Sequence, residues 1–200
     1  AEALLIAHPR TRYVLVCADV ERFAAYNARH GREAGDELLS YLGASLAQAL
    51  PPRSVAGRVG ADRFAVLAPR SLLEEAALAE ALSRGPAGAR CAVRMGTCEA
   101  GPGSSAPGPA DALERALLAL RAAKSERRGP RVRRFSPAML EEALLYQDAL
   151  EGLGAAMASG GLRPAFQPVF ECPPGRLAGA EALSRWGEPG APGPGASVPP

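Results

Sequence analysis

The sequence predicts an α/β (α+β) fold with a mixed central sheet. Three patterns indicate it: an almost continuous apolar run over 12–20, a hairpin-like turn over 58–64, and helix-period segments that alternate with strand-like ones. An apolar run of this kind is typical of a central strand that is covered on both faces. The amphipathic helical segments would supply those covers.

The expected elements follow the chain in order. Helices are expected at 1–8, 21–29, 33–50, 71–83, 111–126 and 138–159, and strands at 12–20, 54–56, 64–68 and 90–99. Ser71 and Glu74 fit a capping box at the start of the fourth helix. Glycine, proline and serine make 101–109 a loop. A solvated basic patch is expected at Arg131, Arg133 and Arg134.

The composition limits the classes of function. The 200 residues carry 23 basic and 21 acidic side chains, which gives no electrostatic footprint for nucleic acid or a membrane surface. No apolar run approaches the ~20 residues of a membrane span, and no signal peptide is visible. The four cysteines match no zinc or disulfide pattern and are expected to be reduced thiols of a cytoplasmic protein. The chain begins in mid-pattern and is interpreted as a fragment, so a membrane anchor in a longer parent stays open.

Two predicted strand ends carry carboxylates. Asp19 ends the apolar run, and Asp62 lies at the tip of the hairpin turn. Carboxylates at two strand ends can hold a hard divalent cation against phosphate groups. The alternative for Asp19 is the N-cap of the following helix, and the alternative for Asp62 is turn chemistry.

Two stretches of the chain resemble the GGDEF domains, which make cyclic di-GMP from two molecules of GTP. Residues 60–64 read Gly-Ala-Asp-Arg-Phe where that family has its signature pentapeptide, and residues 19–24 read Asp-Val-Glu-Arg-Phe-Ala where it has Asp-x-Asp-x-Phe-Lys. Asn27 and the Gly35-Asp36 pair also match in order and spacing. The resemblance implies a five-stranded sheet wrapped by helices, related to nucleotide cyclase and polymerase palm domains.

The resemblance implies a metal site and a guanine site. Asp19, the Val20 carbonyl and Asp62 would bind Mg²⁺ together with GTP. Asn27 and Asp36 would read the guanine edge, because an amide and a carboxylate together satisfy it. Alternatively, both residues are ordinary polar side chains on helix surfaces, and Asp36 in the first turn of a helix is also favoured by the helix dipole.

The resemblance also implies contacts to the rest of the nucleotide. Lys124 and Arg128 match the two cations that hold the GTP phosphates in the family, and Phe23 and Gly60 would lie beside the nucleotide. The alternative for the two cations is generic, since basic residues favour a helix C-terminus.

Three departures from the family pattern argue against cyclase activity. Arg63 places a cation where the signature has an acid, so like-charge repulsion should weaken metal binding and leave Asp62 and Arg63 as remnants of the catalytic signature. Ala61 adds a Cβ where close approach to the nucleotide is wanted, and Ala24 removes a phosphate-binding lysine. The family's Arg-x-x-Asp product site would fall at 51–54, which reads Pro-Pro-Arg-Ser.

Residues 161–200 resemble the opening of an EAL domain, the cyclic di-GMP phosphodiesterase that often follows a GGDEF domain. The implied organisation is a degenerate GGDEF domain at 1–136, a linker helix at 137–160 and a truncated EAL start at 161–200. About 40 residues cannot close a barrel of ~250 residues, so this piece alone is not a working phosphodiesterase. The residues that carry the resemblance are Gln167, Pro168, Glu181, Ala182, Leu183, Arg185 and Trp186.

Three functions stay open on the sequence. The first is a catalytically inactive GGDEF domain of cyclic di-GMP signalling that binds guanine nucleotide, as GTP or cyclic di-GMP, and regulates its own EAL domain. The second is a weakly active diguanylate cyclase that uses Asp19 and Asp62. The third is a scaffold or homodimerisation module without a nucleotide site. No nucleic-acid partner is expected.

Overall fold

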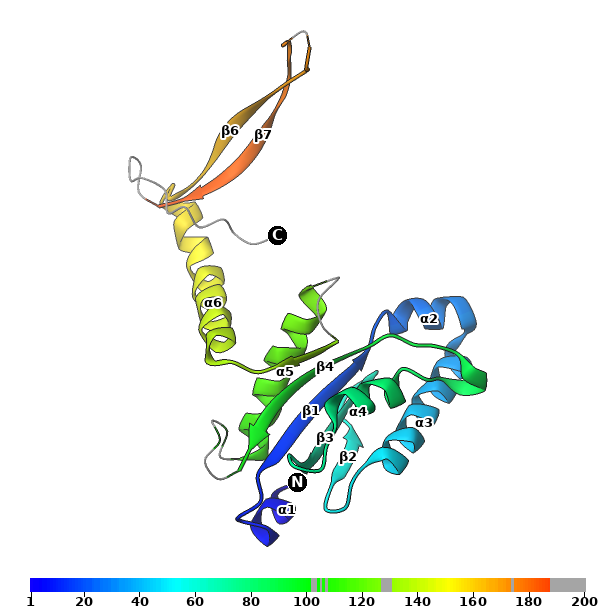
Figure 1. The fold of residues 1–200 in the computed structure, drawn as a ribbon. Helices are drawn as coiled ribbons and strands as arrows, with labels where there is room; N and C mark the ends of the chain where they lie inside the picture. Colours follow the sequence, from blue (N-terminus) through cyan, green and yellow to red (C-terminus); the bar gives the residue numbers. More distant parts are fainter. Residues whose placement is uncertain (102–103, 105, 107, 127–130, 174, 188–200) are drawn as a thin grey trace. The chain divides into compact units, whose positions relative to one another are not determined.

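The computed structural model describes residues 1–101, 104, 106, 108–126, 131–173 and 175–187. It divides into two compact units, Ala1–Glu141 and Glu142–Pro200. The first unit holds the sheet and the helices that cover it, and the second holds most of one helix and a β-hairpin (Figure 1).

The sheet of the first unit is mixed, as the sequence predicts. In the described residues it has five strands in the order β2-β3-β1-β4-β5, antiparallel except for the parallel pair β4 and β5. All eight residues of the central strand β1 are buried, which confirms that it is covered on both faces. The strands are β1 (Tyr13–Val20), β2 (Val55–Arg58), β3 (Arg63–Pro69), β4 (Val93–Ala100) and β5 (Val132–Arg134).

Helices cover both faces of the sheet. The side chains of β1 alternate between two cores, as the period of a strand requires. One core packs Val14, Val16, Ala18 and Val20 against leucines of α3 and α4, and the other packs Tyr13, Leu15 and Cys17 against α5. The helices of this unit are α1 (Glu2–Ala7), α2 (Phe23–His30), α3 (Arg32–Ala49), α4 (Glu75–Leu82) and α5 (Pro109–Ser125), with a short 3₁₀ turn η1 (Pro86–Gly88).

A glycine lets α5 approach the sheet closely. A Cβ on Gly96 of β4 would overlap the Ala116 carbonyl oxygen and would stand 2.8 Å from the Ala119 carbonyl carbon. Both atoms belong to the backbone of α5, which cannot give way as a flexible side chain can. Because Asp19 continues the strand face of Tyr13, Leu15 and Cys17, its side chain lies on the α5 side of the sheet.

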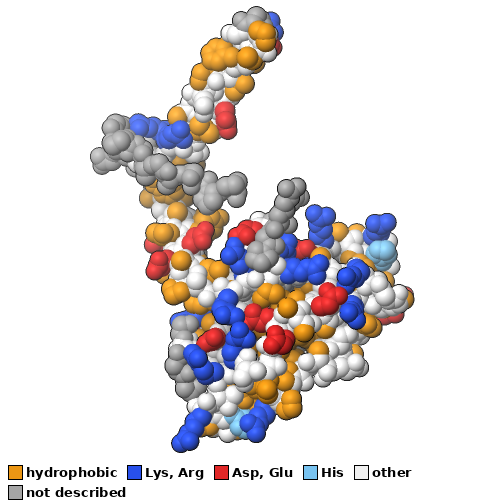
Figure 2. Space-filling view, in the orientation of Figure 1, with side chains coloured by type: hydrophobic (Ala, Val, Ile, Leu, Met, Phe, Trp, Pro, Cys, Tyr) orange, Lys and Arg blue, Asp and Glu red, His pale blue; other side chains and the backbone are white. Residues whose placement is uncertain are grey.

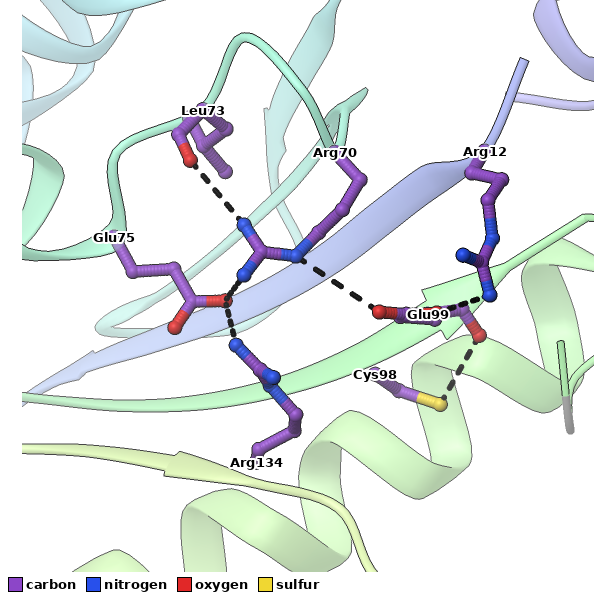
Figure 3. A network of polar contacts seen from close by, with 7 residues as sticks. All are labelled: Arg12, Arg70, Leu73, Glu75, Cys98, Glu99 and Arg134. Carbon is purple, nitrogen blue, oxygen red and sulfur yellow. Dashed lines mark hydrogen bonds and ion pairs between the residues drawn. The ribbon is translucent and has the colours of Figure 1, made fainter.

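A network of charged side chains joins five elements or their edges at the other end of the sheet (Figure 3). Glu99 pairs with Arg12 at 3.4 Å and with Arg70 at 3.9 Å, while Glu75 pairs with Arg70 at 3.9 Å and with Arg134 at 3.4 Å. Each acid is shared by two guanidinium groups. The network therefore links the segment before β1 with β4, β5, the residue after β3 and the start of α4.

Several local predictions need correction. The capping box at Ser71 is wrong, because α4 begins at Glu75 with Glu74 itself as the N-cap. The fourth strand begins at Val93 rather than at residue 90. The basic patch at Arg131, Arg133 and Arg134 is not only a solvated face, because Arg133 and Arg134 belong to strand β5. In the second helix, Arg22 is the N-cap in the left-handed region (φ 56°), which excludes Asp19 from that role.

The second unit consists of most of α6 (Pro137–Ala158) and the hairpin of β6 (Leu162–Phe170) and β7 (Leu177–Trp186). The two strands pair antiparallel, with Gln167 opposite Glu181. Apolar side chains gather over this hairpin (Figure 2). Several of its large apolar side chains are exposed: Phe166, Val169, Phe170, Leu177 and Trp186. Among the described helices, none is long and apolar enough to cross a membrane.

Candidate functional site

The predicted metal residues lie at neighbouring strand ends. Asp19 at the end of β1 is 1% exposed, and the Val20 amide donates to the Asp62 carbonyl oxygen at 3.3 Å. The Asp19 carboxylate is held by two cations. Lys124 Nζ donates to its Oδ1 at 2.5 Å and Arg63 Nη2 to its Oδ2 at 3.4 Å. We call Asp19, Asp62, Arg63 and Lys124 the strand-end cluster.

The sheet register explains why cations surround Asp19. Arg63 on β3 and Arg94 on β4 are its direct cross-strand partners, so Asp19 is flanked by arginine on both sides. Residues that stand opposite one another share a face of the sheet. Arg94 also donates from Nε to Glu21 Oε1 at 2.6 Å. The sequence did not single out Arg94 as a neighbour of Asp19, because this placement follows from the pairing of β1 with β4.

The strand-end cluster does not fit Mg²⁺. This ion needs near-octahedral oxygen ligands at about 2.0–2.1 Å. Both carboxylate oxygens of Asp19 already contact a cation, so a metal ion would stand beside two fixed positive charges. Within the described residues, no group of three or more His, Cys, Asp or Glu side chains is placed to hold a metal ion.

The signature turn is held by its own arginine. Arg58 at the end of β2 donates from Nε to the Gly60 carbonyl at 3.1 Å and to the Ala61 carbonyl at 3.0 Å. Neither Gly60 nor Ala61 has a positive φ, so alanine is compatible with the backbone of this turn. A Cβ on Gly60 would meet only the Arg63 Cβ at 3.5 Å, an ordinary contact. Alanine at position 61, in place of the second signature glycine, therefore introduces no backbone strain into the turn.

The predicted guanine residues lie where α2 and α3 meet. Asn27 packs against Gly35, since a Cβ on that glycine would overlap Asn27 Oδ1 and stand 3.1 Å from Phe23 Cζ. Asn27 Oδ1 is buried and has no hydrogen-bond partner among the described residues. Asp36, next to Gly35, is exposed. We call Phe23, Asn27, Gly35 and Asp36 the α2–α3 cradle.

Of the remaining predicted residues, all but Arg128 lie in the part of the chain that the structure describes. Lys124 lies in the last turn of α5 and reaches Asp19, whereas Arg128 lies outside the described residues. Glu181, Ala182, Leu183 and Arg185 all lie on β7 of the second unit.

A hollow of about 260 Å³ opens beside the end of β1. It is lined by α2 and its N-cap, by Leu38 of α3, by the segment that leads into β4 and by Val20 and Glu21, and it includes neither Asn27 nor Asp36. Arg22, Arg29 and Arg90 make its lining basic. The sequence reasoning did not single it out, because its residues come from separate segments with no shared motif.

The family comparison agrees with this fold. Residues 1–129 match the family described as diguanylate cyclase, GGDEF domain. The chain belongs to the GGDEF family, of the cyclic di-GMP signalling kind, and its fold is the one that the sequence predicts.

One curated relative and two solved GGDEF domains show how far the similarity extends. The uncharacterized protein y4lL of Sinorhizobium fredii is 29% identical over 189 residues, which are 90% of this chain and 23% of the relative. The GGDEF domain of PA1120 (YfiN or TpbB) from Pseudomonas aeruginosa is similar at 26% identity and a TM-score of 0.53, over 67% of this chain and 89% of that one. A microbial GGDEF domain described in its interaction with cyclic di-GMP has 26% identity and a TM-score of 0.53, over 66% and 83%. The chain spans less than a third of the length of the curated relatives it matches.

Proposed function

We propose that residues 1–136 form a catalytically inactive GGDEF domain that binds guanine nucleotide and regulates an adjoining EAL domain. The observation that carries the proposal is the Asp19 carboxylate, 1% exposed and closed between Lys124 and Arg63. A carboxylate that is saturated by fixed cations is poorly suited to receive a metal ion.

The reaction of the family depends on metal ions at this carboxylate. Phosphoryl transfer from GTP needs cations that neutralise the phosphates and activate the attacking hydroxyl, and GGDEF domains generally use Mg²⁺ with GTP for this. Here Asp62 is the remaining acid of the strand-end cluster without an ion pair in the described residues. The lysine of the family pattern is replaced by Ala24, which is exposed and offers no donor to phosphate.

The α2–α3 cradle supports retained binding of guanine. The buried Asn27 Oδ1 without a partner is costly unless a ligand or water satisfies it. Gly35 keeps the space that Asn27 occupies, and Asp36 beside it is open to solvent. Lys124 at the end of α5 is the cation proposed to meet the phosphates, together with Arg128.

The EAL assignment of residues 161–200 rests on motif and length. The y4lL match covers 189 residues, which extends well beyond the 129 that the family match covers. The hairpin puts Gln167 directly opposite Glu181, so both motifs of the resemblance meet on neighbouring strands. Its exposed apolar side chains fit a pair of strands that packs against further strands and helices in a complete barrel. Residues 137–160, most of which form α6, are the proposed link between the two domains.

The test combines calorimetry with product analysis. GTP is titrated into the full chain, and the mixture with Mg²⁺ is then chromatographed for cyclic di-GMP. We expect binding without product, and we expect Asp36→Ala to abolish the binding. Glu37→Ala, which removes the neighbouring exposed carboxylate, is the matched control and should bind as the native chain does. A chain that neither binds nor forms product is a scaffold or dimerisation module.

A weakly active cyclase is the second candidate, and one observation favours it. The hydrogen bond from the Val20 amide to the Asp62 carbonyl keeps the two acid-bearing strand ends together. Cyclic di-GMP above background in the native chain, and its loss in Asp62→Asn, would overturn the inactive assignment.

A further inference from the structure

We infer that the nucleotide site of this domain works without a divalent cation, and that Arg63 and Lys124 act as fixed cations in its place. The inference rests on the proposed function, because it concerns how the same site binds GTP. It goes beyond that function by assigning a metal-free triphosphate as the ligand.

The charges of the site are already balanced within the chain. Asp19 faces Lys124 at 2.5 Å and Arg63 at 3.4 Å, and Glu21 faces Arg94 at 2.6 Å. A divalent ion would have to displace a guanidinium or an ammonium from a carboxylate that is almost fully buried. A metal ion is therefore a poor competitor for Asp19.

Arg63 and Lys124 have further N–H groups that do not contact Asp19 and can bind a ligand. The side chains of Arg63 and Lys124 are 39% and 44% exposed, although the carboxylate between them is buried. A guanidinium and an ammonium each have several N–H donors, and the contacts to Asp19 use one from each. Arg63 Nε is buried and has no partner in the described part of the chain. An anion at the strand ends would find the exposed N–H groups of Arg63 and Lys124 in place, whereas Nε would become accessible only if the Arg63 side chain moved.

The chemistry of the donors fits phosphate. A guanidinium binds phosphate oxygens through two parallel N–H groups, and a lysine ammonium adds a compact positive charge. Arg63 stands in the signature position where the family pattern has an acid, so the substitution turns a metal-binding corner into an anion-binding one. The ion pairs with the buried Asp19 carboxylate hold both cations in position.

The first experiment compares two titrations of GTP into the full chain, one with EDTA and one with Mg²⁺ in excess. The apparent Kd in EDTA should be equal to or lower than that in Mg²⁺, because excess Mg²⁺ complexes GTP and lowers the concentration of the metal-free form. Binding only with Mg²⁺ would overturn the inference and leave the proposed nucleotide binding intact. Absence of GTP binding in both titrations would overturn the proposed function, and the inference with it.

The second experiment changes the fixed cations. Arg63→Glu should weaken GTP binding in EDTA by about tenfold or more, and Lys124→Gln should weaken it in the same direction. Arg10→Glu, an equal charge change at an exposed position before β1, is the control and should keep the native Kd. Unchanged metal-free binding in both cluster variants would contradict the inference.

The third measurement reads the metal directly and needs no nucleotide. Mn²⁺ is titrated into each protein, and the electron paramagnetic resonance signal of the free ion is followed. The native chain should leave that signal unchanged, whereas Arg63→Glu, which restores an acid beside Asp19 and Asp62, should reduce it. Saturable Mn²⁺ binding by the native chain that Asp19→Asn removes would overturn the inference.

Discussion

The strand-end cluster and the α2–α3 cradle adjoin the same strand–helix connection, yet they differ in how their polar groups are satisfied. In the cluster, the buried Asp19 is held by two cations of the chain itself. In the cradle, the buried Asn27 Oδ1 has no partner in the described residues, and Asp36 faces solvent. The comparison teaches that the two halves of the proposed nucleotide site differ: ion pairs within the chain satisfy the buried carboxylate of one half, whereas a buried acceptor of the other half has no partner in the described residues.

The largest expected effect comes from moving α5, which carries Lys124 to the cluster. Gly96→Ala puts a Cβ into the backbone of α5, 2.8 Å from the Ala119 carbonyl carbon, so the helix must shift. We expect the free energy of unfolding to fall by about 3 kcal/mol, measured by urea denaturation. Gly43→Ala is the control, because its Cβ would meet only Phe64 at 3.8 Å. An alanine in a helix interior should be neutral or stabilise by up to about 1 kcal/mol.

The position of α5 also shows which features could not be predicted from the sequence. The strand run, the hairpin and both carboxylates were predictable, because period and turn chemistry are local. The pair of Lys124 with Asp19 was not, since the residues are 105 positions apart and their contact depends on how closely α5 packs against Gly96. Strand β5 was missed because its three residues, two of them arginine, show no apolar alternation.

The second prediction breaks the cradle and leaves the cluster intact. Gly35→Ala would overlap Asn27 Oδ1, a side chain that can rotate away, so we expect a loss of about 1–2 kcal/mol in the free energy of unfolding and loss of GTP binding. The double variant with Asn27→Ala should recover part of that stability, because it removes the overlapping atom. Equal stability of the single and double variants would mean that Asn27 does not pack on Gly35.

The third prediction opens the cluster. Asp19→Asn keeps the shape of the side chain but removes the charge between Lys124 and Arg63. We expect the free energy of unfolding to fall by about 1 kcal/mol, a reduced value because both cations are partly exposed. Glu114→Gln, at an exposed position of α5, should change it by less than about 0.5 kcal/mol. A neutral result for Asp19→Asn would show that the two ion pairs contribute nothing to stability.

The effect that is smallest at neutral pH, and that develops only above pH 9, concerns Cys17, which lies on the same strand face as Asp19 and reports how well water is excluded from the sheet beside the cluster. Burial raises the pKa of the Cys17 thiol from 9.0 to about 12, against an opposing pull from Arg63. Above pH 9 the unfolded chain releases the proton while the folded chain keeps it until about 12, so stability falls as pH rises through this window. The slope is at most about 1.4 kcal/mol per pH unit. Urea denaturation across these pH values should show a shallower fall in Cys17→Ala than in the control Cys172→Ala, whose cysteine is exposed. Equal slopes would mean that water reaches the thiol and that the sheet beside Asp19 is less sealed than its burial indicates.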